Sequence, residues 1–204
     1  MWRSLAAAAI GYLAGTFPSA ELAVGAATHG ELDVHEAGTG NPGALNTSLA
    51  IGKTWGAAVL VADVGKGVLA ARIGHAVAGD DGAHAAAAAA VIGHCYPVWY
   101  GFRGGKGVAT SVGQVLGTFP AYVPIDIAVA GTVAAVPSWT RRTFAATVAA
   151  SVAWVGSSLL WWRKGWPNLW GPPPSAALPI AAAVSSTAIL IRFLQEGVEE
   201  VSAG

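Results

Sequence analysis

Apolar stretches of near-spanning length follow one another along almost the whole chain, and this pattern limits the fold more than any other feature. Of the 204 residues, 54% are hydrophobic and 11% are charged, whereas a soluble domain carries about 25% charged residues. Because charge is scarce throughout residues 1–204, the sequence predicts a single all-α integral membrane domain rather than one very apolar soluble domain. The formal net charge is zero, so no nucleic acid is expected as a partner.

The number of spans follows from the length of these stretches, since a helix needs roughly 20 mostly apolar residues to cross a bilayer. The sequence predicts about seven transmembrane helices, at residues 5–27, 54–73, 83–100, 107–119, 121–137, 144–162 and 175–193. The fourth and fifth stretches are short and are separated only by "FPAYVP", so they form either two spans or one broken pair. The first stretch also has features of a signal peptide, but its apolar character continues through Val24, which favours a first span.

Basic residues give the orientation of the chain in the membrane. With seven spans and the N-terminus outside, the cytoplasmic side holds six lysine and arginine residues and the outer side holds four. This difference agrees in direction with the positive-inside rule. The glycine-rich segments 38–43 and 101–107 then lie on the same cytoplasmic face, and we expect them to converge in space.

Charged residues occur inside the predicted spans, where they need a partner. In "VADVGKG", Asp63 and Lys66 lie three residues apart and therefore on one helix face. An unpaired charge at that depth costs at least about 3 kcal/mol, so the two either form a structural ion pair or contact a substrate. Glu21 lies near the end of the first span, after Pro18. Its carboxyl group is either a buried ligand or a group that reaches the lipid headgroups.

The first glycine-rich segment, "GTGNPG" at residues 38–43, has two interpretations. Glycines leave backbone N–H groups accessible, and successive N–H groups in a turn form a site for anions. The alternative is an ordinary surface turn, which is typical of any cluster of glycine, asparagine and proline. Its candidate ligands are Gly38, Thr39, Gly40, Asn41 and Gly43.

The second segment, "GFRGGKGVAT", is the stronger candidate for a phosphate site. It combines glycines with two cations, and a helix that opens at Gly107 would direct its first N–H groups at the same space. The spacing is not that of the phosphate-binding loop of nucleotide hydrolases, which needs a glycine where Tyr100 stands. The alternative is a positively charged connector between spans. Its candidate ligands are Arg103, Gly104, Gly105, Lys106, Gly107 and Thr110.

Metal and redox chemistry have no support in the sequence. His94 lies near the second segment, but no cluster of histidine, cysteine or carboxylate residues has the spacing of a metal site. Cys95 is the single cysteine of the chain, which excludes an internal disulfide. We therefore expect no metal and no other cofactor.

Three stretches together resemble the bacterial membrane glycerol-3-phosphate acyltransferases that use acyl-phosphate, the PlsY family. They are "GTFPSAE" followed by "GTGNPGALN", then "ADVGKG", and finally "GHCYPVWYGFRGGKGVATSVG". The resemblance covers about residues 11–120 and implies a seven-helix protein of the bacterial inner membrane. It also implies acyl transfer from acyl-phosphate to the 1-hydroxyl of glycerol 3-phosphate, within membrane lipid and without a cofactor. The products would be lysophosphatidate and phosphate.

The resemblance also implies which residues form the site. Catalytic roles fall on Thr39, Asn41, His94 and Lys106. Substrate-binding roles fall on Gly40, Gly43, Asn46, Asp63, Lys66, Gly104, Gly105, Gly107 and Thr110. The residues themselves add Gly38, Arg103, Arg141 and Arg142 as candidate substrate contacts. Acyl-phosphate is an activated mixed anhydride and needs no protein nucleophile, so positioning and charge stabilisation would supply most of the catalysis.

Several positions depart from the family pattern. The family's basic residue before "GTGN" is His35 here, and Leu49, Phe144, Phe193 and Glu196 stand where the family has polar or basic residues. Losing an arginine and a histidine would weaken a site for a doubly anionic substrate, unless Arg141 and Arg142 compensate. The sequence therefore leaves other functions open: a related acyltransferase with a different acceptor, a catalytically weak scaffold or partner subunit, and a transporter that uses Asp63 and Lys66.

Overall fold

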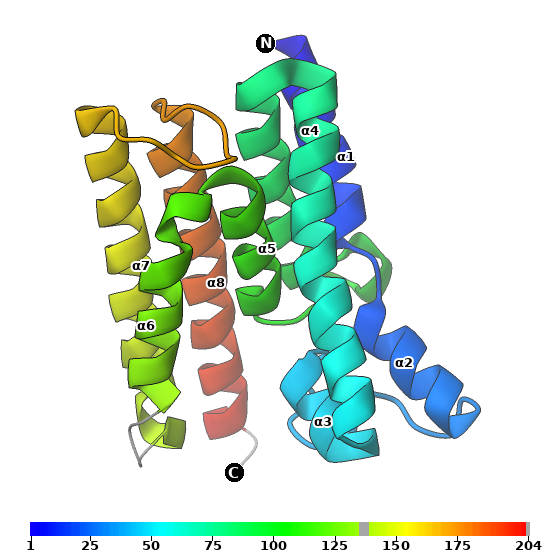
Figure 1. The fold of residues 1–204 in the computed structure, drawn as a ribbon. Coiled ribbons are helices and arrows are strands. Elements are labelled where there is room, and N and C mark those ends of the chain that lie inside the picture. The colour runs from blue at the N-terminus through cyan, green and yellow to red at the C-terminus, as the bar shows by residue number, and fades with distance from the viewer. Residues whose placement is uncertain (135–138, 203–204) are drawn as a thin grey trace.

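The computed structural model describes residues 1–134 and 139–202, and side chains within residues 1–129, 131–132 and 144–195. Over these residues the chain forms helices and turns without a strand, which confirms the all-α prediction. Most helices run alongside one another, with the N-terminus at one end of the bundle and α8 ending at the other (Figure 1). The helices are α1 (Trp2–Gly15), α2 (Ser19–Thr28), α3 (Ala44–Ile51), α4 (Lys53–Cys95), α5 (Val108–Thr118), α6 (Val123–Ala134), α7 (Trp139–Lys164) and α8 (Ala177–Ser202).

Helix α4 contains both the second and the third predicted spans. Its backbone leaves the helical region at Ala78 (φ −141°, ψ 21°) and Gly79 (φ 66°, ψ −152°). The positive φ at Gly79 suits glycine, which has no Cβ to clash with the backbone. The chain therefore folds back on itself, and the two legs of α4 descend side by side from this bend (Figure 1).

The first predicted span is broken, contrary to the sequence expectation of one continuous helix over residues 5–27. Helix α1 ends at Gly15 and α2 begins at Ser19. Pro18 stands in the break, where its ring fixes φ and its missing N–H cannot continue the hydrogen-bond ladder. The third span is also shorter than expected, because α4 ends at Cys95 rather than at residue 100.

The length and hydropathy of the described helices support fewer spans than the seven expected. Two helices, Phe144–Lys164 and Ala177–Gln195, are long and apolar enough to cross a membrane. A third span is added if α5 and the start of α6 count as one element, and this pair bends by 115°. The bend agrees with the broken-pair interpretation of the fourth and fifth stretches.

Small residues bring the helix backbones of this fold into direct contact. Gly11 and Gly15 of α1 pack on the backbone of Ala86 and Ala90 in α4, where an added Cβ would overlap the carbonyl groups. Small residues at four-residue spacing allow this close approach, which is the usual way that membrane helices pack. Ala86 and Ala90, which are four residues apart within the alanines of residues 85–90, thus form the α4 side of this contact.

The contact between α4 and α5 gives a testable case, because Gly113 of α5 packs against Gly67 and the Val64 carbonyl of α4. We expect Gly113→Ala to destabilise the protein by roughly 1–3 kcal/mol, since the added methyl group would force the two backbones apart. Gly156→Ala in α7 is the control, because nothing lies within 4 Å of the added Cβ. Thermal unfolding of the purified variants measures the effect, and equal midpoints for both would contradict this packing.

Candidate functional site

A small pocket lies where the α1–α2 break, the middle of α4 and the loop before α5 meet. It is lined by residues 15–21, Pro42, Asp63, Lys66, His94, Pro97, Tyr100, Gly104 and Gly105. Its volume of about 10 Å³ corresponds to space for about one water molecule. Pro42 comes from the first glycine-rich segment, and Gly104 and Gly105 come from the second. The expected convergence of the two segments is therefore confirmed.

Three polar side chains of α4 form the floor of this pocket. Lys66 Nζ lies 3.0 Å from Asp63 Oδ1, and His94 Nδ1 lies 3.7 Å from the same oxygen. The bend at Ala78 and Gly79 makes this possible, since it brings His94 on the second leg back to the first leg. Asp63, Lys66 and His94 are at most 8% exposed. The ion pair predicted from the sequence is thus present, and it also lines the pocket.

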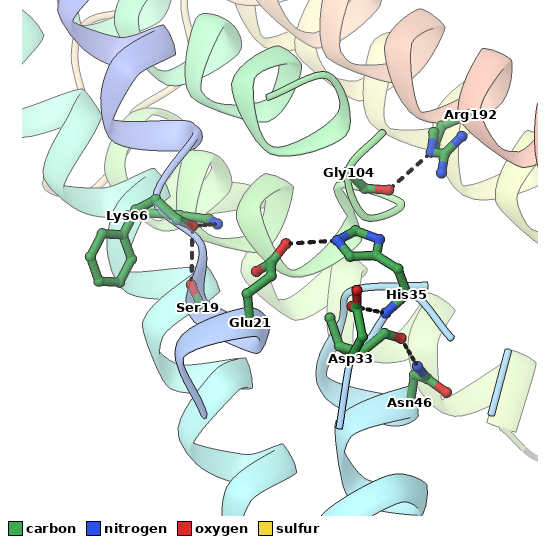
Figure 2. Close-up of polar contacts among 10 residues, drawn as sticks. Ser19, Glu21, Asp33, His35, Asn46, Lys66, Gly104 and Arg192 are labelled. Atoms are coloured by element: carbon green, nitrogen blue, oxygen red, sulfur yellow. Dashed lines mark hydrogen bonds and ion pairs between the residues drawn. The ribbon is translucent and has the colours of Figure 1, made fainter. Parts of the chain in front are cut away.

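The break between α1 and α2 supplies another partner for Lys66. Its ammonium group donates to the Phe17 carbonyl at 3.0 Å, and the Ser19 hydroxyl donates to the same carbonyl at 3.5 Å (Figure 2). A buried charge needs such partners because burial removes its hydration. Lys66 is therefore held between Asp63 on α4 and the break between α1 and α2.

The glycines of the second segment serve packing rather than amide exposure. Gly104 N–H donates to the Cys95 carbonyl at 3.0 Å and Gly105 N–H to the His94 carbonyl at 3.1 Å. The expectation that these two glycines leave free amides is therefore wrong. A Cβ on Gly105 would collide with His94 Nε2 and would lie 2.8 Å from the Pro42 carbonyl oxygen. Glycine is needed here because other segments press against the backbone.

The first segment is likewise organised by its own hydrogen bonds. Asn46 is buried, accepts from Thr39 N–H at 2.9 Å, and donates to the carbonyls of Val34 and Ala37 at 3.2 and 2.9 Å. The amides that follow are used too: Gly40 donates to the Ala37 carbonyl at 3.0 Å, and Gly43 to the Asn41 carbonyl at 2.8 Å. The amides of Thr39, Gly40 and Gly43 are therefore used within the turn, as the turn interpretation of residues 38–43 expects, and a role of this segment in substrate binding stays a prediction.

Lys106 lies on another side of the same loop, where α5 begins. Its Nζ atom is 4.9 Å from the centre of the Phe193 ring of α8, within the range of a cation–π contact. Gly107 precedes α5 with a φ of +80°, and Thr110 is fully buried in the first turn of α5. Lys106 thus directly precedes the start of a helix, and a helix N-terminus with a neighbouring cation is suited to binding phosphate. Lys106, Gly107 and Thr110 do not line the small pocket.

An apolar groove of about 270 Å³ opens between α5, α6, α7 and α8. Val108 and Val112 line it from α5, Ala150 and Trp154 from α7, and Phe193 from α8. Phe193 thus contacts both the groove and Lys106. The ammonium group of Lys106 therefore lies beside the apolar groove.

The remaining candidates of the sequence lie elsewhere. Arg103 is exposed and lines a separate surface hollow together with Arg192. Leu49 is 69% exposed and does not line the pocket, and Phe144 is also exposed. The side chains of Arg141, Arg142 and Glu196 lie outside the described part of the structure.

Some residues of the site were not in the predicted set. Arg192 of α8 donates from Nε to the Gly104 carbonyl at 3.1 Å (Figure 2). The signal in the sequence was a charged residue within an apolar predicted span, and the structure buries its side chain. Tyr100 lines the pocket, and burial, aided by the nearby carboxyl groups of Glu21 and Asp33, raises the pKa of its phenol. Tyr100 therefore stays a neutral hydrogen-bond donor over the physiological pH range.

Comparisons with known proteins point to one enzyme family. A family model described as "Glycerol-3-phosphate acyltransferase" matches residues 5–199. The glycerol-3-phosphate acyltransferase of Maricaulis maris is 39% identical over 160 residues, which cover 78% of this chain and 72% of that relative. A relative of the same name from Cereibacter sphaeroides is 40% identical over 116 residues, so the aligned part spans only 57% of its length.

Solved structures cover more of the chain. The crystal structure of PlsY, an integral membrane glycerol 3-phosphate acyltransferase, in its glycerol 3-phosphate form is 28% identical with a TM-score of 0.73. The match covers 98% of this chain and 92% of that one. The form with lysophosphatidic acid is 27% identical with a TM-score of 0.68 and has the same coverage.

Proposed function

The chain belongs to the glycerol-3-phosphate acyltransferase family, and from that premise we propose that it acylates the 1-hydroxyl of glycerol 3-phosphate with acyl-phosphate. The acceptor oxygen bonds to the acyl carbon, and the bond from that carbon to the phosphate oxygen breaks. The hydroxyl proton leaves with the released phosphate, so the products are lysophosphatidate and inorganic phosphate. No protein nucleophile takes part.

One observation carries this proposal more than any other. Residues far apart in the sequence, namely Pro42, the Asp63–Lys66 pair, His94 and Gly104–Gly105, line one pocket. They come from the three stretches that carry the family resemblance. A reaction between two phosphorylated substrates needs two neighbouring sites for anionic groups, and this pocket and Lys106 at the start of α5 could provide them. A transporter or a scaffold does not need such a pair of sites.

The proposal includes the membrane setting. The chain would cross a bacterial inner membrane seven times, with α1, the two legs of α4, α5, α6, α7 and α8 as the crossing elements. The course of the chain supports this number, because successive elements run in alternating directions through the bundle (Figure 1). Large apolar side chains on these helices, such as Val61, Leu69, Val152 and Ile180, are exposed and would face lipid.

Each substrate has a candidate place. The tail of acyl-phosphate would lie in the apolar groove, and its phosphate would meet Lys106 and the first N–H groups of α5. Glycerol 3-phosphate would enter the small pocket beside Lys66. That pocket holds about 10 Å³ as it stands, so acceptor binding requires its walls to separate.

The decisive experiment uses the purified full chain in lipid nanodiscs with palmitoyl phosphate. We expect phosphate release that depends on glycerol 3-phosphate and saturates with it, together with lysophosphatidate detected by mass spectrometry. Glycerol and other polyol phosphates serve as comparison acceptors. Phosphate release that is indifferent to glycerol 3-phosphate would reject the proposal, and saturation only by another acceptor would identify a related acyltransferase.

The position of the acyl tail gives a prediction of its own. Ala150→Trp should fill part of the groove and raise the KM for palmitoyl phosphate about tenfold while sparing decanoyl phosphate, since each excluded methylene loses about 0.8 kcal/mol. Ala149→Trp is the matched control, because Ala149 is exposed next to it on α7. Steady-state kinetics with both donors measure the effect. The same donor preference in both variants would place the tail elsewhere.

A further inference from the structure

Glu21 makes a polar contact at the edge of the pocket that the reaction scheme does not use. Its Oε1 atom lies 3.4 Å from Nε2 of His35, and the two side chains are 16% and 27% exposed. Glu21 belongs to α2 and lines the pocket, whereas His35 belongs to the segment that leads to the first glycine-rich turn. Figure 2 shows the two side chains pointing toward each other.

The charges of the pocket make this contact important. Among its lining residues, Glu21 and Asp63 are acidic and Lys66 is basic. Lys66 is already 3.0 Å from Asp63, so the lining holds two carboxyl groups for one ammonium group. A carboxylate facing the pocket would repel an anionic acceptor, and such repulsion is strong where water is scarce.

We propose that His35 is a positioning residue that sets the affinity for the anionic acceptor by neutralising Glu21. This inference rests on the proposed function and names a determinant of its acceptor site. With one proton held between imidazole and carboxyl group, the pair presents no net negative charge to the pocket. His35 does this in the position where the family resemblance has a basic residue.

The surroundings of His35 hold its ring in place. Its backbone N–H donates to Asp33 Oδ1 at 2.8 Å, and Asn46 binds the carbonyl of the preceding Val34 at 3.2 Å. The imidazole ring lies 5.6 Å from the ring of Tyr100, centre to centre. His35 thus contacts Glu21 of α2 and Tyr100 of the loop before α5, and both of these residues line the pocket.

The proposal predicts an effect on KM rather than on kcat, because neither side chain touches the reacting atoms. In the nanodisc assay with saturating palmitoyl phosphate, His35→Ala should raise the KM for glycerol 3-phosphate about tenfold and change kcat by less than about twofold. His35→Gln should act alike while keeping a similar shape. Adding Glu21→Gln to His35→Ala should restore the wild-type KM, and His35→Lys should keep it, since lysine carries the positive charge.

A matched control exists at the other end of the α4 hairpin. His75 Nδ1 lies 3.3 Å from Asp80 Oδ1, and both side chains are exposed and away from the pocket. His75→Ala should leave the KM unchanged, and thermal unfolding of every variant shows whether the fold is intact.

Two results would overturn the inference. The first is an active wild type in which His35→Ala and His35→Gln match His75→Ala in KM, and the second is a double variant as impaired as His35→Ala. A wild type without turnover that depends on glycerol 3-phosphate would instead reject the proposed function, and this inference with it.

Discussion

Replacing Lys106 with alanine is expected to lower kcat/KM by about two to three orders of magnitude, the loss that follows when one preorganised group opposite a developing charge is removed. The Lys106 ammonium group lies over the Phe193 ring beside the apolar groove, just before α5 begins. It is therefore placed where the phosphate of a bound acyl-phosphate would meet the protein. Initial rates of phosphate release at several donor concentrations measure the effect.

Lys164→Ala is the control for this prediction. Lys164 is an exposed cation in the last turn of α7, and its removal deletes the same charge without touching the groove. We expect its kcat/KM to stay within about twofold of the wild type, because exposed charges contribute little. Equal losses in the two variants would show that net charge, and not the position of Lys106, matters.

Gly105→Ala is expected to have an effect of similar size, about a hundredfold in kcat/KM, for a different reason. The added methyl group would collide with the His94 imidazole and approach the Pro42 carbonyl, so at least one wall of the pocket must shift. A displacement of about 1 Å in a reacting geometry costs about that factor. Turnover and thermal unfolding are measured together, so that a lost site is distinguished from a lost fold.

Gly65→Ala provides the comparison within α4, since nothing lies within 4 Å of a Cβ at that position. We expect it to keep full activity and to gain slightly in stability, because alanine favours a helix over glycine. If Gly105→Ala were as active as Gly65→Ala, the packing of the second segment against the first would not matter for catalysis.

The sequence predicted the chemistry of the site better than its geometry. The Asp63–Lys66 pair followed from three-residue spacing on a helix, a local rule that tertiary structure did not change. The addition of His94 to that pair was not predictable, because it depends on the bend at Ala78 and Gly79 that folds α4 back. The break of the first span had a signal in Pro18, which cannot continue a helix, but the apolar residues at 5–15 and 22–27 favoured a single span.

The glycine-rich segments show a different limit. Composition predicted exposed amides, and only tertiary structure reveals that Cys95 and His94 carbonyls accept the hydrogen bonds of Gly104 and Gly105. Helix α3 was missed as well, because a segment of eight residues is too short to show a recognisable helical pattern of apolar residues. Phe193 stands where the family has a histidine, and the sequence therefore suggested that a substrate-binding group is missing there. In the structure its ring contacts Lys106.

The α4 hairpin also determines which part of the protein can move when the acceptor enters. Gly74 and Gly82 face each other across the bend so closely that neither has room for a Cβ, so the two legs cannot slide past one another. Asp63, Lys66 and His94 therefore lie on a tightly packed part of the pocket. We expect α2, which is joined to α1 through the break at Pro18, to be the wall that moves when the acceptor enters.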